Sequence, residues 1–207
     1  MENKALQSYL SDVLKHMPMD WVRLTTHRLD IYDESQAKTQ FLEQFKALYE
    51  KKDASQESLA SLPTAFDYIR LGHPLSCVLE WSLAKAHHLE ADSVITFSSS
   101  TMPILAVLRK NLMEEKKTRI VYSGKLPSHF DIETIQNVYG YSFDVHQVDS
   151  AEEVQSFDGR TVFICEQEDL FNIKLQEHID FFVSMHPALG SLILVNGEQN
   201  KVYVGEI

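Results

Sequence analysis

The chain has 207 residues, 44% of them hydrophobic and 24% charged, which suits one globular domain or one domain with a helical arm. With 30 acidic and 19 basic side chains, it carries a formal net charge of −11. Nucleic acids and anionic membranes bind basic surfaces, so neither is an expected partner. No apolar run approaches the ~20 residues that span a bilayer, and the amphipathic N-terminus lacks the apolar core of a secretory signal.

The two cysteines, Cys77 and Cys165, lie far apart in the sequence, each within an apolar run. Small buried hydrophobic side chains follow this pattern, and no disulfide framework or CxxC pair is implied. The sequence therefore favours a reducing compartment, the cytoplasm.

The N-terminal segment, residues 1–62, is predicted to be helical because apolar residues recur at helical spacing. Its predicted elements, in chain order, are a helix over 4–17 ended by Pro18, a short strand within 21–32, a helix from the caps Asp33 and Ser35 to about Lys51, and a polar link.

Residues 63–207 alternate between short apolar runs and helical periodicity. The predicted strands are a buried one that ends at Phe97 and the runs 119–122, 141–149, 161–166, 191–196 and 201–207. The predicted helices are one around Leu79-Glu80, one that begins at Pro103, one over 132–139 ended by Gly140, a short one capped by Ser150, and one over 175–185 with Ile179, Phe182 and Val183 inward. This alternation predicts a three-layer α/β domain, a mostly parallel sheet with helices on both faces.

Ligands of such sheets bind at the carboxyl ends of the strands, here 97–100, 122–124, 166–169 and 196–198. At the first of these ends, a hydroxyl-rich turn precedes the Pro103 helix: Ser98, Ser99, Ser100 and Thr101. Hydroxyls and backbone N–H groups at a helix N-terminus can hold a phosphate or carboxylate. The alternative is that these side chains only cap the helix.

Other candidate groups have equally simple structural explanations. Cys165, followed by Glu166, could be a nucleophile or a buried thiol. The acidic residues from Glu166 to Asp169 could hold a divalent cation or form a solvated loop. No metal site is predicted, because metal-ligand spacing is absent from His73, His87 and His88. No hydrolase, zinc or P-loop motif occurs.

From about Phe66 to Asn200, the chain resembles the Cys/Met-metabolism family of pyridoxal-phosphate (PLP) enzymes, of the cystathionine synthase and lyase type. The residues that carry this resemblance are Tyr68-Ile-Arg70-Leu-Gly-His73-Pro74, then Leu79-Glu80, the run from Phe97 to Met102, and the later stretches VFICEQEDLF, EHIDFFVSMHPALG and LILVNGEQ. The family has Tyr-x-Arg-x-x-Asn-Pro, a Leu-Glu helix, and strands ending in Ser-Gly-Met, Glu-x-x-x-Asn-Pro and Val-Asp-Asn-Thr.

The resemblance assigns cofactor-binding positions to Tyr68, Arg70, Ser98, Ser99, Ser100, Thr101, Met102 and Asn196. In the family, the Tyr–Arg pair binds the cofactor phosphate of the neighbouring subunit, which implies a homodimer. A bidentate guanidinium suits that task. The alternative for Arg70 is an ion pair with Asp67.

Several family groups are replaced. Thr101 stands for a glycine, Pro127 for the ring-stacking tyrosine and Asn196 for the aspartate that holds the pyridinium nitrogen. A neutral amide holds that nitrogen less well, so the electron sink is weakened. Leu170-Phe171 replaces an Asn-Pro pair. The Schiff-base lysine would follow Asn196 by some twenty residues, and Lys201 is too close.

The expected function is therefore that of a pseudoenzyme: a non-catalytic PLP-transferase-like domain that dimerises and binds a small anionic ligand. PLP could still bind, but not as an aldimine. One alternative is that this chain is part of an active PLP-dependent lyase or transferase of sulfur amino-acid metabolism whose lysine lies outside this chain. Another is a sugar-phosphate-binding domain, since ITFSSSTMPILAVLRKN and RIVYSGKLP are similar to sequences of translation-initiation-factor-2B-like and sugar-phosphate isomerase proteins.

Overall fold

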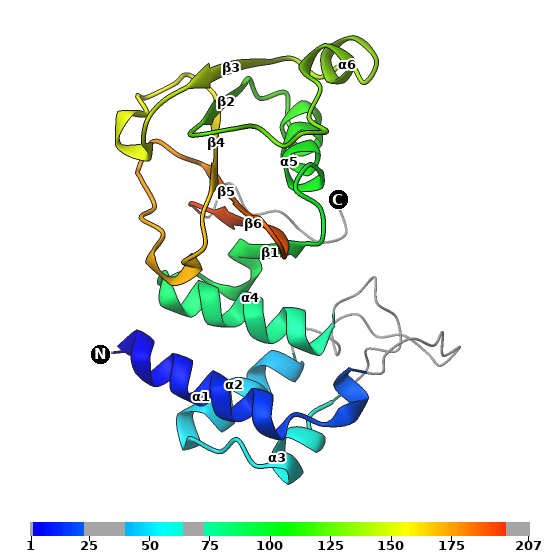
Figure 1. Ribbon diagram of the computed structural model, residues 1–207, viewed down its shortest axis with the longest axis vertical. Helices are drawn as coiled ribbons and strands as arrows, with labels where there is room; N and C mark the ends of the chain where they lie inside the picture. Colours follow the sequence, from blue (N-terminus) through cyan, green and yellow to red (C-terminus); the bar gives the residue numbers. More distant parts are fainter. Residues whose placement is uncertain (1, 23–39, 64–72, 198–207) are drawn as a thin grey trace. The chain divides into compact units, whose positions relative to one another are not determined.

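The computed structural model describes residues 2–22, 40–63 and 73–197 (Figure 1). The chain divides into two compact units, Met1–Ala86 (unit 1) and His87–Ile207 (unit 2). The sequence places a boundary between residues 62 and 63, whereas the helix that begins at Pro74 groups with unit 1. None of the helices in the described ranges is long and apolar enough to cross a membrane.

Unit 1 is helical in its described part. Its elements are α1 (Glu2–His16), η1 (Met19–Trp21), α2 (Phe41–Lys51), α3 (Gln56–Ala60) and α4 (Pro74–Ala86). Most of the predicted strand within 21–32, and both predicted caps, Asp33 and Ser35, lie outside the described residues. Helix α3 occupies the predicted polar link, where the Ser55 hydroxyl accepts a hydrogen bond from the Ser58 N–H at 3.4 Å.

Aromatic side chains form the core of unit 1. The Phe45 ring is fully buried and lies 5.3 Å from the Trp81 ring and 6.0 Å from the rings of Tyr9 and Phe41. The Tyr9 hydroxyl donates to the Asp53 carbonyl at 3.0 Å, and burial, reinforced by the Asp53 charge, raises the pKa of Tyr9 to about 12. One aromatic cluster therefore joins α1, α2 and α4.

Unit 2 contains a six-stranded sheet with helices, the mixed α/β architecture that the sequence predicts. Its strands are β1 (Val94–Phe97), β2 (Thr118–Tyr122), β3 (Phe143–Gln147), β4 (Arg160–Glu166), β5 (Phe181–His186) and β6 (Gly190–Val195). Its helical elements are η4 (Ala91–Ser93), α5 (Met102–Met113), α6 (Ile132–Asn137), η5 (Ala151–Glu153) and η6 (Leu170–Asn172).

The strand order is β1-β6-β5-β4-β2-β3. Strands β3, β2, β4 and β5 pair in parallel, whereas β6 is antiparallel to both of its neighbours, β5 and β1. Within the described sheet, five strands therefore run in one direction and β6 runs in the other. The predicted mostly parallel sheet is confirmed, while the predicted last strand over 201–207 lies outside the described residues.

One face of the sheet packs against α5 and α6. Side chains from α5, β4 and β5, such as Ile104, Ile164 and Val183, belong to one buried cluster on this face, and α5 runs beside the sheet in Figure 1. Side chains alternate along each strand, so Phe163 and Phe182 point to the opposite face. Helices on both faces, the predicted third layer, remain a prediction.

The predicted helix over 175–185 is wrong, because residues 181–186 form β5 between β4 and β6. The inward spacing assigned to Ile179, Phe182 and Val183 comes from an unbroken apolar run, FFVSM, which suits either a helix or a strand. In the structure both faces of this run are buried, and the run pairs with β4 on one side and β6 on the other, so it is a strand.

Strand β3 lies at one edge of the described sheet. The side-chain amide of Gln136, on α6, donates to the backbone carbonyl of Phe143 at 2.9 Å. Asp144 and His146 of the same strand are exposed. A side chain thus occupies one of the backbone acceptors of this edge strand.

Candidate functional site

The antiparallel direction of β6 separates the predicted strand-end positions. Phe97 pairs with Ser191, at the start of β6. The turn after β1 therefore lies at the same end of the strands as the carboxyl ends of β4 and β5. Asn196 follows β6 at the opposite end of the strands, where its N–H donates to the Asp180 carbonyl at 2.8 Å. The side-chain amide of Asn196 donates to the carbonyls of Gln176 and Ile179. Asn196 is therefore not brought together with residues 98–102.

The turn from Ser98 to Met102 uses its own backbone donors. The Ser99 hydroxyl accepts hydrogen bonds from the N–H groups of Thr101 and Met102, at 3.2 and 3.3 Å. Pro103 has no N–H, and the next two N–H groups along α5 donate to the Thr101 carbonyl. The N–H groups of residues 101–105 are thus bonded within the turn or absent. The Ser99 hydroxyl, two residues before the N-cap Thr101, therefore accounts for this helix start, whereas the Thr101 side chain makes no cap bond.

Replacing Ser99 by alanine should remove these hydrogen bonds. We expect the free energy of unfolding to fall by about 1 kcal/mol, the usual net contribution of a side-chain hydrogen bond to the backbone. The measurement is chemical denaturation followed by circular dichroism. Ser100→Ala is the matched control, because the neighbouring Ser100 hydroxyl has no such role, and equal losses in the two variants would contradict the assignment.

A close backbone contact fixes the same turn. The Ser191 hydroxyl donates to the Ser99 carbonyl. Gly190, which opens β6, has φ +109°, and a Cβ atom there would lie 2.2 Å from the Phe97 carbonyl oxygen. Only glycine lets the β5–β6 hairpin approach β1 this closely.

The predicted cofactor residues do not form one PLP pocket in the described part of the chain. Tyr68 and Arg70 lie outside the described residues. In residues 98–102, the backbone N–H groups at the start of α5 are already hydrogen-bonded. Asn196 lies at the opposite end of the strands. Asn196 is therefore separated from residues 98–102, and the cofactor-binding roles of all these residues remain predictions.

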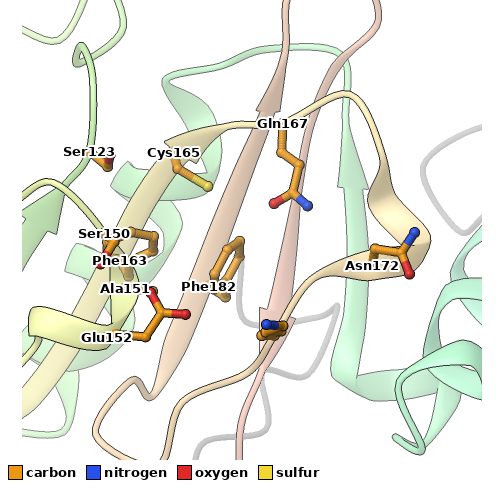
Figure 2. A pocket seen from close by; sticks show the side chains of 10 residues that line it. Ser123, Ser150, Ala151, Glu152, Phe163, Cys165, Gln167, Asn172 and Phe182 are labelled. Atoms are coloured by element: carbon orange, nitrogen blue, oxygen red, sulfur yellow. The ribbon is translucent and has the colours of Figure 1, made fainter.

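A cavity of about 250 Å³ opens on the sheet face opposite α5 and α6, near the carboxyl ends of β2, β3 and β4 (Figure 2). Its lining combines hydroxyls, amides, a thiol, two charged groups and two rings: Ser123, Ser150, Ala151, Glu152, Phe163, Cys165, Gln167, Asn172, Lys174 and Phe182. The Phe163 and Phe182 rings, whose centroids lie 5.3 Å apart, form an apolar floor. This cavity is the candidate functional site.

Sequence reasoning located part of this site. Ser123 and Gln167 lie at two of the predicted strand ends, and the structure brings them to one cavity. It missed Ser150 and Glu152, which lie in the connection after β3, although the strand-end rule applied to β3 points to this connection. The predicted helix after Ser150 is the short 3-10 turn η5, and the Ser150 side chain makes no cap bond to it.

Charged groups of opposite sign line the cavity. The pKa of Glu152 is lowered by hydrogen bonds from its own backbone N–H and from the Ser150 hydroxyl, and by the positive charge of Lys174. Glu152 is therefore ionised at neutral pH. Among the described lining residues, Lys174 alone is positively charged.

Cys165 lies on β4 at the base of the cavity and is partly buried. Burial raises the pKa of its thiol from 9.0 to about 11. At neutral pH the sulfur is therefore protonated, and only the thiolate is a good nucleophile. A buried, protonated thiol therefore describes Cys165 better than a nucleophile does.

Alkylation of Cys165 by iodoacetamide should be slow at pH 8.5 and should rise with pH to a midpoint near the pKa of about 11. A shift of two pKa units reduces the thiolate fraction about a hundredfold. The rate at Cys165 is followed by mass spectrometry of the alkylated peptide, with the chain unfolded in urea as the reference. A native midpoint equal to the urea midpoint would show that the thiol is not desolvated.

Asp169, the last residue of the acidic stretch after β4, supports local structure. Asp169 accepts a hydrogen bond from the Phe171 N–H at 3.1 Å and another from the side-chain amide of Asn172. The ring of His87 bonds the Leu170 carbonyl at 2.7 Å. In the described ranges, no group of three or more His, Cys, Asp or Glu side chains could hold a metal ion.

Comparisons with known proteins do not assign a family. No family model matches the chain, and no curated protein matches it. A crystal structure from Campylobacter jejuni, described as an O-acetylhomoserine (thiol)-lyase with N'-pyridoxyl-lysine-5'-monophosphate, aligns at 15% identity with a TM-score of 0.37. The match covers 86% of this chain and 54% of that one, so this chain spans about half the length of the lyase. So low a TM-score leaves both the fold relationship and the ligand as proposals.

Proposed function

We propose that the chain is a non-catalytic α/β protein that binds a small anionic ligand in the cavity between Ser123, Glu152 and Lys174. The supporting observation is this cavity's place at the carboxyl ends of three parallel strands, with one ammonium group in its lining. Ligands of parallel α/β sheets bind at this edge. Lys174 would hold the anionic group by charge.

The chemistry of the lining supports binding rather than catalysis. The protonated thiol of Cys165 is a poor nucleophile at neutral pH. In the family that the sequence resembles, the reaction depends on an aspartate at the position of Asn196 and on a Schiff-base lysine that follows it in the sequence. The lysine of this cavity, Lys174, precedes Asn196, and Asn196 does not line the cavity. A homodimer in which Arg70 reaches the neighbouring copy belongs to the same proposal and rests on the sequence resemblance alone.

The binding proposal is tested by the thermal shift that inorganic phosphate or citrate produces in the full chain. A ligand of the folded state raises its stability by mass action, by about 1.4 kcal/mol at ten times Kd. We expect Lys174→Ala to abolish the shift. Lys116→Ala, which removes the same charge at an exposed site outside this cavity, should leave it unchanged. A shift that survives Lys174→Ala would place the anion elsewhere.

The enzyme alternative is tested with PLP itself. We expect no aldimine absorbance when PLP is added, and borohydride should fix no pyridoxyl group to any lysine. Specific trapping on one lysine at stoichiometric PLP would overturn the non-catalytic proposal. Light scattering of the same sample measures whether the chain is a dimer.

A further inference from the structure

The hydrogen-bond donors around the cavity are largely used by the protein. The Ser123 hydroxyl donates to the Asp149 carbonyl at 2.8 Å, and the Gln167 amide donates to the Asp169 carbonyl at 2.9 Å. The Asn172 amide donates to the Asp169 carboxylate. Carbonyl and carboxylate oxygens can only accept, so the direction of each of these three bonds is fixed.

The oxygens of the same side chains remain as acceptors. They are Ser123 Oγ, Gln167 Oε1 and Asn172 Oδ1, and the ionised Glu152 carboxylate can only accept as well. Figure 2 shows the Glu152 carboxylate and the Gln167 amide directed toward the space above Phe182. The Ser150 hydroxyl is used on Glu152. Apart from Lys174, the weak S–H donor of Cys165 and one remaining N–H on each amide, the polar side chains of the described lining therefore offer acceptors.

The excess of hydrogen-bond acceptors over donors in the lining restricts the chemistry of the ligand. A dicarboxylate brings only acceptors, and inorganic phosphate at neutral pH carries only one or two O–H groups. Either ligand would leave some of the lining's acceptor oxygens facing ligand oxygens without protons between them. An ammonium ligand would satisfy the acceptors but would be opposed by Lys174. A hydroxyl group donates one hydrogen bond and accepts others, so it satisfies both the acceptors and the remaining amide N–H groups.

We propose that the ligand is a polyhydroxylated anion, with its anionic group at Lys174 and its hydroxyls donating to Glu152, Gln167 and Ser123. This inference rests on the proposed function, which supplies the anionic group. A cavity of about 250 Å³ holds roughly eight water volumes of about 30 Å³ each, the space of a small polyol. The Phe163–Phe182 floor would contact the C–H groups of the ligand.

The test compares four probes by calorimetric titration of the full chain: ribitol 5-phosphate, gluconate, ribitol and inorganic phosphate. We expect the two hydroxylated anions to bind at least tenfold more tightly than phosphate or ribitol. If phosphate binds as well as ribitol 5-phosphate, the hydroxyl inference fails while the anion site stands. If ribitol binds as well as ribitol 5-phosphate, the anion site fails while the hydroxyl inference stands. Absence of binding by all four probes would overturn both.

A single substitution gives a second readout. Gln167→Met keeps the length of the side chain but removes its acceptor, so we expect ribitol 5-phosphate to bind about two- to tenfold more weakly, with phosphate binding unchanged. Gln155→Met makes the same chemical change outside the cavity and should alter neither. Equal weakening of both probes by Gln167→Met would show a general structural effect and contradict direct recognition of the hydroxyls.

Discussion

Gly190→Ala is expected to lower the free energy of unfolding by about 2–5 kcal/mol. The new Cβ atom would lie 2.2 Å from the Phe97 carbonyl oxygen and 3.1 Å from the Ser98 Cα, both backbone atoms that cannot rotate away. The φ of +109° adds the cost of a left-handed conformation for a residue with a side chain. Chemical denaturation followed by far-UV circular dichroism measures the loss.

Gly140→Ala separates the two causes of this loss. Gly140 also has a positive φ, +75°, but a Cβ atom there would meet nothing within 4 Å. We expect a loss of only about 1–2 kcal/mol, from backbone strain alone. If Gly190→Ala and Gly140→Ala lose equal stability, the close approach of the β5–β6 hairpin to β1 does not contribute to the loss at Gly190.

Phe45→Ala should destabilise unit 1 by about 3–5 kcal/mol, because it leaves a large cavity in a core of rings. Phe45 is fully buried between Tyr9, Phe41 and Trp81. The chain has two tryptophans, Trp21 and Trp81, and both belong to unit 1. Tryptophan fluorescence during urea unfolding therefore reports on this unit.

Leu14→Ala is the matched control for the Phe45 variant. Leu14 lies on α1 of the same unit and is 57% exposed, and alanine is the best helix former. We expect a change within about 0.5 kcal/mol. A Phe45→Ala transition that coincides with that of Leu14→Ala would mean that the aromatic cluster does not hold α1, α2 and α4 together.

The alternation of strands and helices in unit 2 could be predicted from the sequence because each element has its own periodicity and its own ending. Pro103 near the start of α5 and Gly140 shortly after α6 mark two of these boundaries. The run around Phe182 and Val183 has no such mark. Its state depends on pairing with β4 and β6, strands that the local sequence does not reveal.

The candidate site was harder to predict for the same reason. Strand-end positions converge only where the strands run in parallel. The reversal of β6 follows from the short turn between Pro187 and Gly190, which becomes a hairpin signal only once the run before it is recognised as a strand. Lys174 and Asn172 reach the cavity from a connection without periodicity. The Ser99 hydrogen bonds at the start of α5 were predictable as one of two alternatives, because local hydrogen bonding by serine follows from spacing alone.

The Gln136 bond to the Phe143 carbonyl has a consequence for self-association. An outer strand offers a row of backbone groups on which another chain can build a continuous sheet, a route to fibrous aggregates. With one carbonyl occupied by a glutamine and with Asp144 and His146 exposed beside it, β3 is a poor template for such growth. Copies of this chain that meet in solution would accordingly join through side chains rather than by extending their sheets at β3.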